Sequence, residues 1–170
     1  RFAPPDISVI HSLAGAEPET VSAVGSTHLQ SNIADTTVTN LRFANGVGAH
    51  IFVSWLHPYK EQRLVVVGER KMAVLGDTRA RGKLKIHDKG FEWAGGVPVP
   101  RNDAETVVEI ADTEPLRLEC EHFLTCVTHR IRPLTDGASA LSVLRVLEAS
   151  QRSIDRGGIP VAVGDVAARV

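Results

Sequence analysis

The chain carries a group of polar and aromatic residues directly after an apolar, strand-like run. The run covers residues 49–56, and Pro58 should end the strand because proline has no backbone N–H for a ladder hydrogen bond. Residues 64–67 form a second apolar run, so the polar segment would lie at a strand end of a sheet. A rigid strand end that presents polar groups is a common frame for a small-molecule site. The predicted substrate-binding residues are Trp55, His57, Tyr59 and Lys60.

The residue types in this segment indicate which ligand it could hold. The ammonium group of Lys60 or the guanidinium group of Arg63 could pair with a carboxylate or a phosphate. The rings of Trp55 and Tyr59 could stack on a sugar or a base. The alternative interpretation is a solvated turn between two strands, with Trp55 half buried. The residue types alone leave both interpretations open.

Motifs for other kinds of site are missing from the sequence. The only Gly-x-Gly, at residues 46–48, lacks the third glycine of a dinucleotide fingerprint and falls in a predicted hairpin. The histidines and cysteines form neither His-Glu-x-x-His nor Cys-x-x-Cys. No Gly-x-Ser-x-Gly elbow places a serine nucleophile. We therefore predict no metal and no cofactor bound by this chain alone, and a self-standing hydrolase is the least favoured function.

Length and composition indicate one ordinary domain. The 170 residues are too few for two domains of average size. The formal net charge of -1 argues against nucleic acid and membrane surfaces as partners, because both attract basic proteins. Cys120 and Cys126 should lie on different faces of a helix, so we expect unpaired thiols and a reducing, cytoplasmic setting. The chain begins at Arg1 without an initiator methionine, so we expect a fragment or a processed chain.

Periodicity predicts three helices. The first covers residues 6–14 and ends at Gly15, a glycine C-cap. The second begins near Pro115 with a single apolar stripe, and the third is capped by Asp136. The stripe of the second helix consists of Leu116, Cys120, Phe123, Leu124 and Val127. The core side of the third helix consists of Leu141, Leu144, Leu147, Ser150 and Ile154.

Asn45-Gly46 predicts a hairpin between residues 36–43 and 47–56, because this pair is the strongest short hairpin signal. A two-residue turn would pair Ala44 with Val47 and place Val38 opposite Val53. In that register each face of the hairpin mixes apolar and polar groups. We therefore expect both faces to be covered, one by helices of this chain and the other by a second subunit.

The remaining strands are predicted from shorter apolar runs. A strand of middling quality covers residues 21–29, and four hairpin or strand segments follow the central hairpin. Residues 94–103 are rich in Gly and Pro and should be irregular. The later runs are 64–67 with 72–75, 84–87 with 91–93, 106–110, and a last edge strand at 159–163. The predicted fold class is α+β, an open, mostly antiparallel sheet of about seven strands with helices packed on one face.

Two segments of the chain resemble the C-terminal domain of the glucose–fructose oxidoreductase, inositol dehydrogenase and MocA (Gfo/Idh/MocA) family. The first is Arg42-Phe43-Ala44-Asn45-Gly46 leading into Val53-Ser54-Trp55. The second runs from Glu114-Pro115-Leu116 through Glu119, His122-Phe123 and Arg132-Pro133-Leu134-Thr135-Asp136-Gly137 to Val146-Leu147-Glu148-Ala149 and Ser153. The run from Trp55 to Gln62 is most similar to members such as UDP-N-acetylglucosaminuronic acid 3-dehydrogenases.

The resemblance implies that this chain would act together with a second domain that has a different role. Family members hold NAD(P) in an N-terminal Rossmann domain, which also supplies a catalytic lysine, and neither is in this chain. Residues 1–170 would be one substrate-side and oligomerisation domain, whose outer sheet face packs on another subunit. Members often carry a catalytic histidine before Asp-Ile-Ser, but here Pro5 precedes Asp6 and cannot transfer a proton, so no catalytic residue is assigned to this chain.

The resemblance therefore implies a substrate-binding C-terminal domain of an NAD(P)-dependent sugar or nucleotide-sugar dehydrogenase, inactive when alone. Its partners would be the sugar or nucleotide-sugar substrate and further copies of the same chain. The alternative is a non-catalytic binding or oligomerisation module of the same fold, which Pro5 and the missing Rossmann half both favour.

Overall fold

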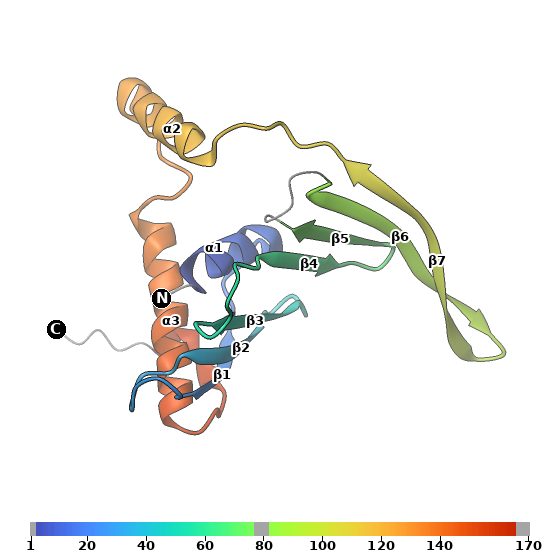
Figure 1. Ribbon diagram of the computed structural model, residues 1–170, viewed down its shortest axis with the longest axis horizontal. Coiled ribbons are helices and arrows are strands. Elements are labelled where there is room, and N and C mark those ends of the chain that lie inside the picture. Colours follow the sequence, from blue (N-terminus) through green and yellow to red (C-terminus); the bar gives the residue numbers. More distant parts are fainter. Residues whose placement is uncertain (1–2, 77–81, 166–170) are drawn as a thin grey trace. The chain divides into compact units, whose positions relative to one another are not determined.

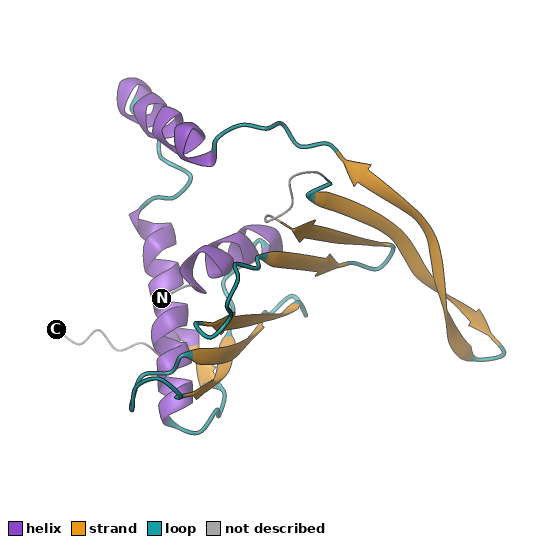
Figure 2. Ribbon diagram, in the orientation of Figure 1, coloured by secondary structure: helices purple, strands orange, loops and turns teal. Residues whose placement is uncertain are grey.

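The computed structural model describes residues 3–76 and 82–165 (Figure 1). The chain divides into two compact units, one formed by residues 1–57 and 122–170 and the other by residues 58–121. Among the described residues, helices and antiparallel strands make up an α+β fold, so the predicted fold class is confirmed (Figure 2). The strands form two hydrogen-bonded sheets of four strands each, rather than the single sheet of about seven that we predicted.

The first unit is a four-stranded antiparallel sheet with two helices. Its strands follow the order β3-β2-β1-β8, and helix α3 packs on β1 and on α1. The 3₁₀ turn η1 (Val163–Asp165) follows β8. The bounds are α1 (Ala3–Ala14), β1 (Thr20–Ser26), β2 (Thr36–Arg42), β3 (Gly48–Ser54), α3 (Gly137–Asp155) and β8 (Val161–Ala162).

The core of the first unit lies between this sheet and its helices. Strand alternation places Val21, Leu41 and Ile51 on the buried face of the sheet, where they meet Ile7 of α1 and Val146 of α3. The other members of this buried cluster are Phe43, Ala149, Val161 and Val163. Burial of such aliphatic side chains, each worth roughly 1.5–3 kcal/mol, is what holds α1 and α3 on the sheet.

The hairpin between β2 and β3 forms as predicted, but its register differs by one residue. Arg42 pairs with Gly48, and the turn between them holds five residues instead of two. The N–H of Phe43 donates to the carbonyl of Val47 at 3.0 Å, and the N–H of Gly46 donates back to the carbonyl of Phe43 at 3.1 Å. Gly46 has φ +83°, which glycine adopts without steric cost. The two-residue turn was therefore wrong, because Gly46 serves a longer turn with one left-handed residue.

The corrected register separates the two faces of the sheet. Thr39 pairs with Ile51 and Leu41 pairs with Ala49 on the buried face, whereas the row Val24, Val38 and Phe52 lies on the outer face. A one-residue slip moves every side chain to the opposite face. The mixed faces expected from the sequence were thus a product of the wrong register. The outer face is mostly polar, with Val24 and Phe52 exposed in its apolar row.

The helix ends follow the sequence signals with small shifts. Helix α1 begins at Ala3, three residues before the predicted start, so Pro4 and Pro5 lie in its first turn, where a missing N–H costs nothing. Asp136 caps α3 as predicted, because its carboxylate accepts the N–H of Ser139 at 2.9 Å. Hydrogen bonds to Ser139 and to Arg132 lower the pKa of Asp136.

The second unit is built around a sheet of order β4-β5-β6-β7. Its strands are β4 (Arg63–Val67), β5 (Lys71–Gly76), β6 (Leu84–Ala94) and β7 (Val97–Val108). The predicted hairpin between β4 and β5 is confirmed, since Val67 pairs with Met72 across residues 68–71. Part of the loop that follows β5 lies outside the described residues.

Two predictions for the second unit were wrong. Residues 84–87 and 91–93 are one continuous strand, because the polar segment between them is absorbed by a bulge between His87 and Lys89. The hairpin turn lies instead at Gly95 and Gly96, which both have positive φ. The region expected to be irregular is strand β7. Its prolines Pro98 and Pro100 are tolerated because β7 is an edge strand.

Helix α2 (Pro115–His129) begins in the second unit and ends in the first. Its apolar stripe has the predicted helical spacing, but Leu116, Phe123 and Leu124 are each 62% exposed. Cys126, beside the stripe, is the buried residue of this helix. Cys120 and Cys126 are free, as predicted. Within residues 3–76 and 82–165, no helix combines the length and the apolar character that a membrane span requires.

Candidate functional site

The predicted site residues follow the end of strand β3, but they belong to two different units. The strand ends at Ser54, so Trp55 and His57 are the last exposed residues before the first unit gives way to the second. Tyr59 and Lys60 are exposed residues at the start of the second unit. Trp55 is 52% exposed and Tyr59 is 65% exposed.

Hydrogen bonds fix the backbone from which Trp55 projects. The N–H of Trp55 donates to the carbonyl of Asp35 at 2.8 Å. The hydroxyl of Ser54 lies 3.2 Å from the hydroxyl of Thr36 and accepts the N–H of Leu56 at 3.1 Å. The indole ring is thus exposed on a segment whose backbone is held at both sides, as a stacking surface for a ligand requires.

His57 lies against the outer face of the sheet. Its ring centroid is 5.7 Å from that of Phe52, with the two rings tilted by 51°. This separation is typical of a favourable aromatic contact. Because Phe52 belongs to the apolar row of the outer face, the contact joins the predicted site to that face.

The structure adds two residues that the sequence did not single out, Asp35 and His28. The carboxylate of Asp35 accepts the N–H groups of His28 and Leu29 at 2.5 and 2.8 Å, and it lies 2.9 Å from Nδ1 of His28. Asp35 is only 6% exposed, whereas the ring of His28 is exposed. A carboxyl residue just before a strand that opens with Thr36 is the sequence signal that could have indicated this turn.

These hydrogen bonds explain the acidity of Asp35. The bond from the His28 side chain lowers the pKa of this carboxyl most, the bonds from the two backbone N–H groups lower it further, and burial opposes them, so the pKa is about 2. The carboxylate of Asp35 therefore remains charged at neutral pH and accepts hydrogen bonds from the backbone of residues 28 and 29. The backbone carbonyl of Asp35 accepts the N–H of Trp55.

Two titratable residues of helix α1 have environments that shift their pKa values. Nδ1 of His11 lies 3.1 Å from the hydroxyl of the buried Ser142 on α3, while Nε2 of His11 is buried without a hydrogen-bond partner. Burial lowers the pKa of His11, against the opposing charge of Glu17, and burial raises the pKa of Asp6. Pro5 lies in the first turn of this helix and offers no group for acid–base chemistry.

The residues described around the end of β3 offer an indole ring, two imidazoles and backbone carbonyls. Such groups bind polar ring compounds by stacking and hydrogen bonding. Within the described part of the chain, no group of three His, Cys, Asp or Glu residues could hold a metal ion.

A comparison with models of protein families gives a match to part of the chain. Residues 3–74 match the family model described as the GFO/IDH/MocA C-terminal domain. Those residues span the first helix, strands β1 to β4 and all four predicted site residues. This match covers less than half of the 170-residue chain, and it agrees with the resemblance noted in the sequence.

Solved structures share the fold over nearly the whole chain. The UDP-N-acetylglucosamine 3-dehydrogenase GnnA from Acidithiobacillus ferrooxidans is 23% identical, with a TM-score of 0.76 over 90% of this chain and 47% of its own. The WlbA dehydrogenase from Bordetella pertussis, solved with NADH and UDP-GlcNAcA, is 23% identical, with a TM-score of 0.66 over 94% of this chain and 43% of its own. A levoglucosan dehydrogenase, solved with NADH and levoglucosan, is 17% identical, with a TM-score of 0.74 over 97% of this chain and 50% of its own.

These comparisons also show how much of each relative the chain represents. It spans about half the length of these solved structures. A search of the curated proteins found no match.

Proposed function

We propose that this chain is the substrate-side part of an NAD(P)-dependent dehydrogenase that acts on a sugar or a nucleotide sugar. The observation that carries the proposal is the family match over residues 3–74, which includes Trp55, His57, Tyr59 and Lys60. Structures that share the fold were solved with NADH and either a nucleotide sugar or an anhydrosugar. The two compact units of the chain would together serve as this substrate-side part.

The residues of this chain do not fit NAD(P) as a cofactor site. The sequence has no dinucleotide fingerprint, and its one Gly-x-Gly forms the hairpin turn between β2 and β3. The NAD(P) that takes up the hydride would therefore be bound by a separate dinucleotide-binding domain. The role left to this chain is to bind and orient the sugar.

Each predicted site residue has a role that its chemistry supports. Trp55 presents a ring face for stacking on the sugar or base, and its backbone is held by Asp35. Lys60 would pair with a carboxylate or phosphate of the substrate, as ammonium groups do. His57 and Tyr59 would exchange hydrogen bonds with sugar hydroxyls.

Pro5 limits what this chain can contribute to the chemical step. The resemblance implies a histidine where Pro5 stands, and proline cannot donate or accept the proton of a sugar hydroxyl. The acid–base group would therefore come from outside this chain. The same residue favours the second candidate function, a binding or oligomerisation module that has lost its chemistry.

The outer face of the first sheet is our proposed contact between copies of the chain. Its apolar row of Val24, Val38 and Phe52, of which Val24 and Phe52 are exposed, gives such a contact an apolar centre within a polar surround. The free thiols of Cys120 and Cys126 are consistent with a reducing, cytoplasmic setting.

A direct test compares two samples, the full-length protein that contains this sequence and the 170-residue chain alone. Each is incubated with NAD⁺ or NADP⁺ and a panel of free and nucleotide-linked sugars. The proposal predicts cofactor reduction by the full-length protein and none by the chain alone. Binding of a nucleotide sugar without any cofactor reduction would favour the non-catalytic module.

A further inference from the structure

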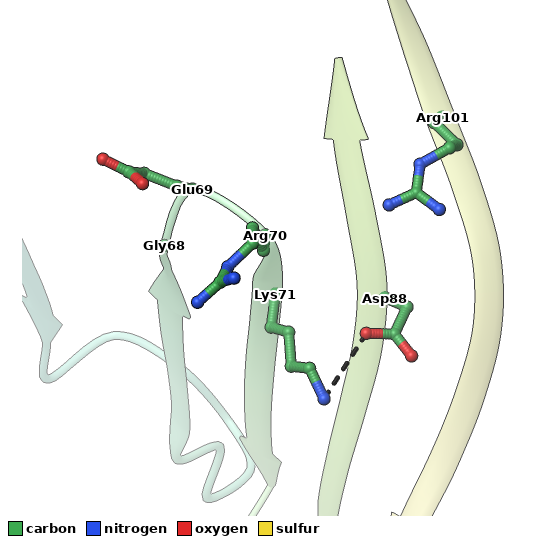
Figure 3. A pocket seen from close by; sticks show the side chains of 6 residues that line it. All are labelled: Gly68, Glu69, Arg70, Lys71, Asp88 and Arg101. Carbon is green, nitrogen blue, oxygen red and sulfur yellow. Dashed lines mark ion pairs between the residues drawn. The ribbon is translucent and has the colours of Figure 1, made fainter. Parts of the chain in front are cut away.

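Strands β6 and β7 continue as a two-stranded ribbon beyond the end of strand β5. The register of β5 and β6 ends where Lys71 pairs with Asp88, and Figure 3 shows the ion pair of 3.5 Å that joins these two side chains. Residues 89–94 of β6 pair with residues 97–102 of β7 (Figure 1). We call residues 89–102 the β6–β7 arm. In the part of the chain that the structure describes, no strand pairs with the arm on its β6 side.

The direction of the backbone groups along the β6 edge of the arm follows from one hydrogen bond. The N–H of Lys89 donates to the carbonyl of Arg70 at 3.0 Å, so the backbone N–H and C=O groups of Lys89 point away from β7. Hydrogen-bonded and non-hydrogen-bonded positions alternate along an antiparallel pair. The backbone groups of Phe91 and Trp93 therefore also point away from β7, out of the ribbon.

The opposite edge of the arm, on β7, is blocked by proline. Pro98 pairs in register with Trp93, and Pro100 pairs with Phe91. These are positions whose backbone groups point out of the ribbon, so each proline removes an outward N–H and leaves the ladder to β6 intact. Prolines at such positions are one means by which proteins prevent edge-to-edge pairing. Strand β6 contains no proline, so its edge, unlike that of β7, keeps its outward N–H donors for a further strand.

This β6 edge carries two large exposed rings and a cation. Lys89, Phe91 and Trp93 lie on one face of the arm by strand alternation, and the ammonium nitrogen of Lys89 lies 5.7 Å from the centre of the Phe91 ring. Phe91 is 61% exposed and Trp93 is 74% exposed. A two-stranded ribbon by itself is only marginally stable in water, so pairing with a third strand would stabilise the arm and cover these rings.

We propose that the β6 edge of the arm pairs with the same edge of a second copy of this chain. In an antiparallel pair centred on Phe91, the two Phe91 residues stand opposite each other, and Lys89 stands opposite Trp93 of the partner subunit. An ammonium group beside an indole ring is favourable, and indole is the best aromatic partner for a cation. On the other face of the pair Gly90 stands opposite Glu92, so like charges do not oppose each other.

The spacing of these residues favours a second copy over an unrelated extended peptide. Lys89 and Trp93 lie two residues before and two residues after Phe91, so the edge is complementary to itself when it is turned by 180°. This contact is separate from the outer face of the first sheet, the other proposed contact between copies. It does not rest on the proposed dehydrogenase function.

Disulfide trapping in the full-length protein tests the pairing at one position. Phe91→Cys, in a background in which Cys120→Ser removes the exposed native thiol, should form a disulfide-linked dimer on mild oxidation. Opposed residues of a hydrogen-bonded antiparallel pair have Cα atoms about 5.5 Å apart, a distance that a disulfide spans.

Val99→Cys in the same background is the matched control. Val99 is an exposed residue of β7 in the same arm. In the proposed pair the two Val99 residues are separated by at least three strand spacings, about 14 Å, which is too far for a disulfide. This variant should therefore stay unlinked under the same oxidation.

A proline placed on the β6 edge gives a second, independent measurement. Trp93→Pro removes an outward N–H from β6, as Pro98 does from β7, and leaves the ladder between the two strands intact. In sedimentation experiments the subunit dissociation constant should rise at least about tenfold, because the pair loses backbone hydrogen bonds and the contacts between Lys89 and the indole ring. The proposal is overturned if Phe91→Cys forms linked dimers no faster than Val99→Cys, or if Trp93→Pro associates as the wild-type protein does.

Discussion

The hydroxyl group of Ser153 on helix α3 forms a hydrogen bond with the backbone of Ala23 at the edge of strand β1, 130 residues away in the sequence. Its oxygen accepts the N–H of Ala23 at 2.9 Å and donates to the carbonyl of Ile159 at 2.7 Å. The neighbouring strand β8 pairs with Thr20 and Val21 only. Ser153 therefore supplies a hydrogen bond just beyond the end of β8 and is itself 0% exposed.

Replacement of Ser153 by alanine should destabilise the first unit by about 1–3 kcal/mol. The substitution leaves the N–H of the buried Ala23 without this partner, which costs its desolvation, and it also removes the hydrogen bond to the carbonyl of Ile159. Chemical denaturation of the wild type and the variant measures the difference. Gln151→Ala on the exposed side of the same helix should change stability by no more than about 0.5 kcal/mol. Equal stabilities of the two variants would contradict this role of Ser153.

The carboxyl of Asp35 should give the protein a pH-dependent stability on the acid side. Its pKa falls from an ordinary value of 3.8 to about 2 in the folded chain, so the folded state binds this proton less readily than the unfolded state. The stabilising contribution is therefore complete above about pH 4 and is lost as the pH falls toward 2. Denaturation at a series of pH values should show a smaller acid-side loss in Asp35→Asn than in the wild type.

His28→Ala tests the cause of that pKa. The substitution removes the side-chain hydrogen bond that lowers the Asp35 pKa most, so the pKa should rise toward its ordinary value. Carboxyl chemical shifts followed by NMR during an acid titration measure it. A pKa that stays near 2 would mean that the backbone N–H groups of His28 and Leu29 suffice.

Gly158 should be intolerant of any side chain. Its φ is +92°, and a Cβ atom there would lie 2.7 Å from Cγ1 of Val24. Gly158→Ala should lower stability by about 1–3 kcal/mol through backbone strain and this clash. Gly137→Ala is the control, since a Cβ atom in this first turn of α3 meets nothing within 4 Å. That variant should be as stable as the wild type or more stable by about 0.4–1 kcal/mol.

Lys60 should contribute to substrate affinity without contributing to stability. In the full-length protein, Lys60→Ala should weaken the binding of an acidic nucleotide sugar by about tenfold, the effect of losing one charge-assisted hydrogen bond. Lys85→Ala removes the same charge from β6, where the ammonium group lies 2.6 Å from Glu105, and should leave affinity unchanged. If both variants bind the acidic nucleotide sugar with equal affinity, Lys60 is not part of the binding site.

The sequence predicted the elements whose signals are local. The cap at Asp136, the glycine after α1 and the hairpin between β4 and β5 each depend on a few neighbouring residues, and each is confirmed. The register of the central hairpin was wrong because Asn45-Gly46 is compatible with both a two-residue and a longer turn. This one-residue difference in register moves the side chains of one strand to the opposite face relative to its partner strand.

Features that depend on contacts between distant parts of the chain could not be predicted from the sequence. Strand β7 looked irregular because its prolines are excluded from central strands, and only the sheet order shows that it is an edge. Asp35 was missed because its partners, His28 and the N–H of Trp55, meet it only once the loop and strand are folded. The four predicted site residues are exposed, which is compatible with a binding site and with the alternative of a solvated turn, and their role in binding stays a prediction.

The measurement that tests the central claim most directly is the initial rate of NAD⁺ or NADP⁺ reduction by the full-length protein, with wild-type sequence and with Trp55→Ala. The account predicts reduction in the presence of a sugar or nucleotide sugar and a marked rise in KM for that substrate in the variant, with the KM for the cofactor unchanged. Trp55 is exposed and its backbone is held by Asp35, so the variant should fold normally. Reduction that is insensitive to Trp55, or no reduction with any sugar tested, would contradict the account.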